Sequence, residues 1–213
     1  MAIVWPCSLS VDQYEAAGRE VTVPAADCPV CRVVMGSWSG YWRTVREAAH
    51  DARIFIARAR CRLCEATHAL LPAFVAYKRL YSVQEMGGVI CDVVEGSGGV
   101  RPAARRRAIP HTTARGWVRR FGVRAPDLAA SFVALAIDLG SEAIRPIANT
   151  ASFALAAMKR AFRAACGMPG WINLTLWHFV SAVTTGSFIA TNTTSPYLIV
   201  GRRYFMAPIP IGT

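Results

Sequence analysis

The stretch from Asp27 to Cys64 opens with Cys28-Pro29-Val30-Cys31 and closes with Cys61-Arg62-Leu63-Cys64, and the fold depends on it. Each Cys-x-x-Cys pair forms a tight loop that chelates a metal from one side, so two pairs can place four thiolates around one zinc ion. Four thiolates leave no open position for a substrate, which makes such a zinc site structural. The 29 residues between the pairs exceed the usual spacing of about 15–20, and an inserted hairpin explains the excess. Two accidental pairs or a disulfide pair are the alternatives.

A small β zinc ribbon is therefore predicted over residues 28–72. Residues 40–46 and 53–60 have strand patterns, His50-Asp51 indicates a turn between them, and the second strand runs directly into Cys61. Such a ribbon has little apolar core, so zinc binding would contribute to its folding free energy. His68 is an alternative fourth ligand, although a surface or core histidine is the favoured interpretation.

The composition places the chain among folded proteins that keep their thiols reduced. Hydrophobic residues make up 54% and charged residues 17%, and the first residues lack the basic start and long apolar run of a signal peptide. We therefore expect a cytoplasmic, nucleoid-associated protein. Seven cysteines then indicate metal binding rather than disulfides. The cysteines outside the two pairs are interpreted as small buried residues: Cys7, Cys91 and Cys166.

The positive charge is confined to one part of the chain. Residues 28–124 hold 17 Lys/Arg and six Asp/Glu, whereas the remainder holds seven of each. A localised basic segment indicates a polyanionic partner, most simply nucleic acid. Nearly all the cations are Arg, which suits bidentate contacts to phosphate and guanine. A GC-rich genome that favours Arg codons is the alternative explanation.

A helix-turn-helix unit is predicted over residues 80–122. Ser82-Val83-Gln84-Glu85 has the spacing of a capping box and predicts a helix to about Glu95. A short basic helix follows over 101–108, and a third runs from Thr112 or Thr113 to Phe121, with Gly122 at its C-terminus. Three helices with a tight turn before the last form the helix-turn-helix pattern.

The third helix has two different faces. Ala114, Trp117, Val118 and Phe121 form the face expected to pack on the other helices, and Thr112, Thr113, Arg115, Gly116 and Arg119 form the other. Short polar residues followed by Arg suit a recognition helix in the major groove of DNA. Four further arginines are expected to contact phosphates: Arg105, Arg106, Arg107 and Arg120. A three-helix packing unit with a solvated basic face is the alternative.

Residues 127–200 are predicted to form a small helical domain, which a 201–213 tail follows. Residues 1–27 are expected to form an N-terminal segment before the ribbon. Asp127 is expected to cap a helix that ends at Gly140, and further helices are expected over 146–165 and 171–185. Residues 171–201 contain no Asp, Glu, Lys or Arg, but Asn173, His178 and many Ser and Thr residues argue against a membrane span. The fold class predicted for the whole chain is α+β, mostly α.

Several motifs together resemble a known family. They are the two cysteine pairs, residues 67–72 after the second pair, residues 113–121, Thr185-Gly186, and Thr191-Asn192-Thr193. They are similar to an uncharacterised family of actinobacterial proteins that pairs a zinc ribbon with a helix-turn-helix and resembles the N-terminal DNA-binding parts of transposases. The resemblance implies DNA binding and an association with mobile elements. Pro102 and Pro110 depart from the simple pattern and predict a short middle helix.

The predicted function is that of a DNA-binding protein, either a transposon-associated accessory factor or a transcriptional regulator, with one structural Zn²⁺ per chain. No enzyme activity is expected, because Asp127, Asp138 and Glu142 are the only acidic residues after Phe121, and their spacing does not suit a two-metal site. The expected partners are double-stranded DNA and a transposase or ATPase of the same element. A homodimer is a further candidate assembly. The alternative function is that of a protein–protein interaction module in a mobile-element complex, without sequence-specific DNA binding of its own.

Overall fold

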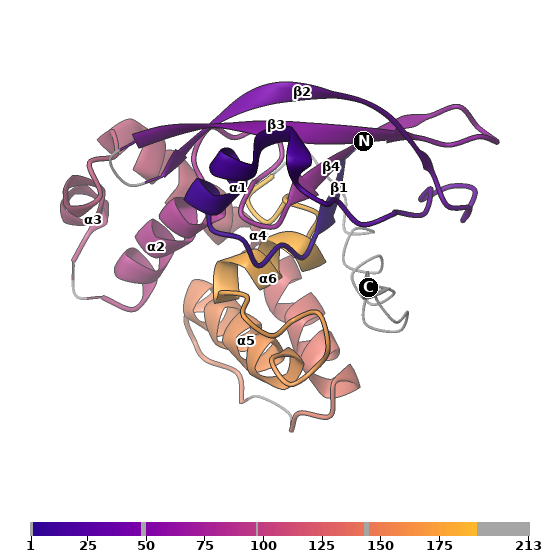
Figure 1. The fold of residues 1–213 in the computed structure, drawn as a ribbon. Helices are drawn as coiled ribbons and strands as arrows, with labels where there is room; N and C mark the ends of the chain where they lie inside the picture. Colours follow the sequence, from indigo (N-terminus) through magenta and orange to yellow (C-terminus); the bar gives the residue numbers. More distant parts are fainter. Residues whose placement is uncertain (1, 48–49, 97, 143–144, 191–213) are drawn as a thin grey trace.

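The computed structural model describes residues 2–47, 50–96, 98–142 and 145–190, and these form a mixed α+β fold. Its sheet has four strands in the order β1-β4-β3-β2. The sheet lies across the top of the view in Figure 1, and most of the helices lie beneath it. The motif at 191–193 and the predicted 201–213 tail lie outside the described residues.

The long hairpin of β2 (Gly36–Glu47) and β3 (His50–Arg60) dominates the sheet. The two predicted strands are confirmed, and each is longer than predicted. His50 and Asp51 were expected in the turn, but both are already paired in the antiparallel ladder, opposite Glu47 and Arg46. A bidentate contact of Arg46 to Asp51, at 2.6 and 2.7 Å, holds this end of the ladder together.

The N-terminal segment contains regular structure that the sequence did not lead us to expect. Strand β1 (Ala2–Trp5) pairs in parallel with β4 (Thr67–Pro72), and helix α1 (Val11–Ala17) follows it. Ser10 and Gln13 cap α1 reciprocally, through the same motif that predicted a helix after Ser82. A one-turn helix η1 (Gly18–Glu20) follows α1. Residues 21–26, which lead to the first cysteine pair, lie in neither a helix nor a strand.

Three helices follow the sheet in sequence and contact one another: α2 (Val83–Val94), α3 (Val100–Arg106) and the start of α4. Ser82 caps α2 as predicted, because its hydroxyl accepts a hydrogen bond from the Glu85 amide at 3.3 Å. Helix α3 is short, as Pro102 and Pro110 predicted.

The expected end of the third helix at Phe121 is wrong. Helix α4 spans His111–Asp138 without interruption, passing through both Gly122 and Pro126. Gly122 and Pro126 lie on the exposed side, so the carbonyl that loses its partner at Pro126 can bind water. The opposite face is continuously buried and therefore outweighs the local breaking signals; it includes Phe121, Ala125, Leu128 and Phe132. Asp127 does not cap a new helix, and instead pairs with Arg124 at 3.0 Å.

The remaining helices are α5 (Thr150–Ala165) and α6 (Leu176–Val183), both within the predicted ranges. Helix α6 packs closely on α2 at Gly87. A Cβ atom at Gly87 would lie 2.0 Å from the Trp177 ring, and one at Gly88 would lie 2.3 Å from the Arg107 guanidinium. Two glycines in the middle of a helix normally weaken it. Here they let two large side chains lie against its backbone.

Two clusters of buried side chains stabilise the fold. The larger one runs from Val4 through the inner face of the sheet to helices α2, α4, α5 and α6, and thus joins the predicted 80–122 and 127–200 segments. The smaller one lies at the end of the sheet near the cysteine pairs. It consists of Ile3, Cys28, Met35, Ala59, Cys61 and Leu70. In the described part of the chain, no helix is long and apolar enough to cross a membrane.

Candidate metal centre and nucleic-acid interface

The two cysteine pairs lie in loops with the same backbone design. In each loop the amide of the first cysteine donates to a carbonyl five residues later, Cys28 to Val33 at 2.9 Å and Cys61 to Ala66 at 3.0 Å. In each loop the residue after the second cysteine also has a positive φ, 61° at Arg32 and 59° at Glu65. This repetition places both pairs in matching chelating loops.

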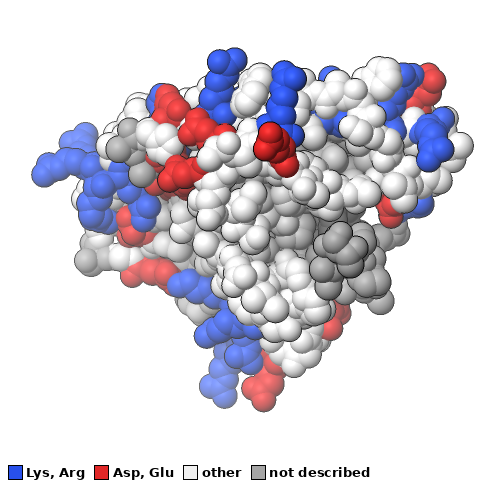
Figure 2. Space-filling view, viewed as in Figure 1, with Lys and Arg blue, Asp and Glu red and all other residues white. Residues whose placement is uncertain are grey.

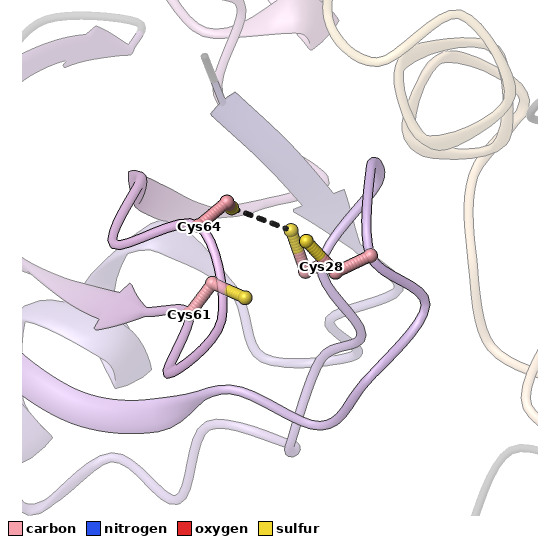
Figure 3. Close-up of side chains that lie close together, drawn as sticks. Cys28, Cys61 and Cys64 are labelled. Atoms are coloured by element: carbon pink, nitrogen blue, oxygen red, sulfur yellow. Dashed lines mark hydrogen bonds between the residues drawn. The ribbon is translucent and has the colours of Figure 1, made fainter.

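The four thiols converge on one point. Their Sγ atoms all lie within 4.8 Å of one another, and those of Cys28 and Cys64 are 3.6 Å apart. Zinc–sulfur bonds of about 2.3 Å in a tetrahedron require Sγ atoms about 3.8 Å apart. Figure 3 shows Cys28, Cys61 and Cys64 pointing into the space between the two loops. The four-cysteine cluster of Cys28, Cys31, Cys61 and Cys64 therefore fits a single metal site, and its donor set favours zinc.

The surroundings of the cluster favour a thiolate at Cys61 and shield half of the site. Backbone amides of Cys64 and Leu63 lower the pKa of Cys61 to about 7. Cys28 and Cys61 are buried, whereas Cys64 is exposed. His68 is buried on β4 outside the cluster and is a core histidine. Of the other cysteines, Cys7 is buried as predicted, Cys91 is only half-buried, and Cys166 is exposed.

A second feature is a hollow between the start of α4 and the loop before α2. It has a volume of about 710 Å³. Its lining residues include five cations and no carboxylate: Lys78, Arg79, Leu80, Tyr81, Thr112, Thr113, Arg115, Gly116, Trp117, Arg119 and Arg120. The residues predicted to form the exposed face of the third helix thus line one surface. The predicted packing face is also confirmed, because Ala114, Trp117 and Phe121 are buried.

The like charges around this hollow lie close together. Burial lowers the pKa of the Arg79 guanidinium, and the positive charge of Arg120 acts in the same direction. Cations crowded together without carboxylates repel one another, so an anion that binds among them relieves this repulsion. Lys78 and Arg79 were not among the predicted site residues. Their basic pair just before the Ser82 cap was the signal that could have identified them.

The three arginines around α3 lie outside this hollow. Arg107 contacts Asp92 at 3.3 Å and Glu85 at 3.6 Å on α2, and Arg106 contacts Asp92 at 3.3 Å. Arg105 is exposed and makes no ion pair within the described residues. Figure 2 shows blue side chains projecting at the left, where α3 lies, and along the upper edge formed by the sheet, around a largely white centre.

Comparison with known proteins adds one match. Residues 28–116 match a family described as a domain of unknown function (DUF6431). The matched region begins at the first cysteine of the metal centre and ends within the polar face of α4. No curated protein and no solved structure matches the chain.

Proposed function

We propose that this protein binds double-stranded DNA through the exposed face at the start of α4, with the zinc centre in a structural role. The observation that carries the proposal is the hollow that joins the loop at Lys78 and Arg79 to Arg115, Arg119 and Arg120 without a carboxylate. DNA supplies the dense negative charge that such a surface can bind. A metal held by four thiolates leaves no position for a substrate, which supports the structural role of the zinc centre.

Within this proposal, α2, α3 and α4 act as a helix-turn-helix, and the start of α4 enters the major groove. Arg115 and Arg119 are both exposed and lie one turn apart, about 6 Å along the helix axis. At least one of them contacts a base edge, with Thr112 and Thr113 beside it. Arg120, Lys78 and Arg79 contact phosphates.

The α3 arginines have a smaller role in this proposal than their sequence suggested. Arg106 and Arg107 already pair with carboxylates on α2, so a phosphate would have to compete with those contacts. Arg105 is exposed and has no ion pair within the described residues, so no carboxylate competes with a phosphate there. The biological role that we propose is an accessory factor of a mobile element or a transcriptional regulator, which acts with a transposase or an ATPase.

The test is a salt titration of binding to a duplex selected from a random pool and to an unrelated duplex. Arg115→Ala should cost about 1–3 kcal/mol on the selected duplex and relax the preference at one base pair. Arg106→Ala should weaken both duplexes alike and reduce the salt slope by at most about one. Arg163→Ala, on the exposed side of α5, removes the same charge far along the sequence and is the matched control.

Two outcomes would change the proposal. If Arg115→Ala affects both duplexes equally, α4 only rests on the DNA backbone, and binding is non-specific. If wild-type protein binds neither duplex, the interaction-module alternative replaces DNA binding.

A further inference from the structure

A second hollow adjoins the first across the loop that contains Lys78, Arg79 and Leu80. It has a volume of about 610 Å³ and lies on the inner face of the sheet, where Tyr41 is paired with Ile56 and Arg58 is paired with Ala69. The three loop residues line both hollows. Like the first, the second hollow has no carboxylate among its lining residues, which are Tyr41, Arg43, Thr44, Arg58, Thr67, Ala69, Leu71, Tyr77, Lys78, Arg79 and Leu80.

The two hollows offer different chemistry to a nucleic acid. In the first, the aromatic residues Tyr81 and Trp117 are buried and unavailable to a ligand. In the second, Tyr41 is 41% exposed and Tyr77 is 42% exposed. Exposed rings combined with cations are the features that bind unpaired nucleotides, because bases stack on the rings while the cations follow the phosphates. A base pair within a duplex has both faces covered by its neighbours and cannot stack in this way.

The loop between the hollows is held in a fixed position. The Arg43 guanidinium donates to the carbonyls of Ala76, at 2.9 Å, and Arg79. The Tyr77 amide donates to the Gly186 carbonyl at 3.2 Å. Gly186 has a φ of +73°, and a Cβ atom there would lie 2.9 Å from the Tyr77 nitrogen, so this contact needs glycine. These contacts therefore fix the backbone of the loop that separates the two hollows.

This loop carries an exposed apolar side chain between the two hollows. Leu80 is 42% exposed and lies between the two basic hollows. Single exposed leucines are common on protein surfaces. At this place, however, the side chain is positioned like the apolar wedges that some DNA-binding proteins insert between bases. A wedge at this place would lie where a strand passes from one hollow into the other.

We propose that the second hollow binds unpaired nucleotides that continue from the duplex bound at α4, and that Leu80 marks the junction. This inference rests on the proposed function, because it takes α4 as the duplex-binding side. The protein then prefers a duplex with a single-stranded extension to a blunt duplex. Tyr41 and Tyr77 stack on the unpaired bases, and Arg58 contacts their phosphates.

The test compares full-length protein on a blunt duplex and on the same duplex with a short unpaired oligothymidine extension at the 3′ or the 5′ end. The extension should tighten binding about fivefold or more, because each stacked base contributes measurably to affinity. Tyr41→Leu and Tyr77→Leu should remove this gain and leave the affinity for the blunt duplex unchanged. Trp38→Leu is the matched control, since Trp38 is 56% exposed but lines neither hollow.

The outcomes separate this inference from the proposed function. Equal affinities for blunt and extended duplexes would overturn the inference and leave duplex binding at α4 intact. A loss of blunt-duplex affinity in Arg58→Ala as large as in Arg115→Ala would also overturn it, because the second hollow would then hold a duplex backbone. If the wild-type protein binds no blunt duplex, the proposed function itself fails.

Discussion

The two ends of the sheet are stabilised in different ways. At the zinc end, the cysteine loops rest on a cluster of six buried residues, two of which are the ligands Cys28 and Cys61. At the other end, Val45, Ala52 and Ile54 of the same hairpin belong to the large cluster that continues into all the long helices. One hairpin therefore joins an end that carries the four-cysteine cluster, here called the zinc end, to an end with an ordinary hydrophobic core.

This difference limits how far the loss of metal should spread. On sequence alone, the whole of 28–72 would unfold without zinc. The structure shows instead that half of the hairpin packs on helices, and burial of those apolar side chains is independent of the metal. Along the first half of β2, by contrast, residues 36–42 are all exposed. We therefore expect that only the zinc end depends on the metal.

The largest expected effect comes from removing a ligand at the zinc end. Cys61→Ser should abolish binding of the single zinc and unfold the cysteine loops, because zinc binding contributes roughly 10 kcal/mol or more in small zinc-stabilised units. Amide hydrogen exchange should show lost protection in 28–39 and 58–66 and retained protection in α2 and α4. Metal analysis should give one zinc per wild-type chain.

Cys166→Ser is the matched control for this experiment, because Cys166 is exposed and lies outside the cluster. It should keep one zinc and full protection. Loss of protection across all the helices in Cys61→Ser would contradict the comparison, since it would make the metal a global determinant of folding.

A smaller effect is expected from Gly87→Ala at the helical end. The added Cβ would overlap the buried Trp177 ring and should destabilise the protein by about 1–3 kcal/mol. Gly36→Ala at the zinc end has no atom within 4 Å of the added Cβ and should change stability by less than about 0.5 kcal/mol. Urea unfolding measures both changes. Equal losses of unfolding free energy in the two variants would contradict the comparison, because the two ends would then be packed equally tightly.

Acid should distinguish the two ends through His178. Burial lowers the pKa of His178 from 6.5 to about 4, so the folded protein keeps this ring neutral. Between pH 6.5 and 4 the unfolded chain takes up a proton that the folded chain does not, and stability falls as the pH falls. The loss should reach about 3 kcal/mol near pH 4. In His178→Gln, the free energy of unfolding, followed by Trp fluorescence, should fall less over this pH window. The pH at which zinc is released should be the same as in the wild-type protein.

The sequence predicted the parts of this fold that follow from short-range chemistry. Cys-x-x-Cys spacing, the Ser82 cap and the apolar spacing of Ala114 and Trp117 each depend on neighbours in the chain, and each is confirmed. The continuous helix through Gly122 and Pro126 could not be predicted in this way, because contacts with α5 outweigh the local signals. The parallel pairing of β1 with β4 joins residues 67 apart in the sequence, such as Ala2 and Ala69, and no local pattern in either strand predicts it.

The candidate DNA site shows the same division. The face of α4 was predicted from helical periodicity, but the contribution of Lys78 and Arg79 depends on how the loop is held by Arg43, which is far away in sequence. Arg106 and Arg107 show the converse, because a basic run that suggested phosphate contacts is partly used in ion pairs with α2. Local patterns identify candidate residues, and tertiary contacts decide which of them share a surface.

The smallest expected effect concerns the matching loops at the zinc end. Arg32 has a φ of 61°, a conformation that costs a side-chain-bearing residue roughly 1 kcal/mol and glycine almost nothing. Arg32→Gly should therefore favour the chelating loop, partly offset by the greater freedom of glycine in the unfolded chain. A net gain of about 0.5 kcal/mol corresponds to zinc affinity about twofold tighter.

Charge must be separated from backbone conformation in this measurement, because a site with four thiolates and Zn²⁺ is negative and Arg32 is positive. Arg32→Ala removes the same charge but keeps the Cβ atom, so the ratio of zinc affinities between Arg32→Gly and Arg32→Ala measures the effect of the backbone conformation alone.

Glu65→Gly makes the same backbone change in the second loop and also removes the 3.1 Å contact to Arg60. Competition with a chromogenic chelator should show Arg32→Gly binding more tightly than Arg32→Ala, with Glu65→Gly close to wild type. If Arg32→Gly and Arg32→Ala bind zinc equally, the loop conformation is imposed by the metal, and the zinc end has no preformed site before zinc arrives.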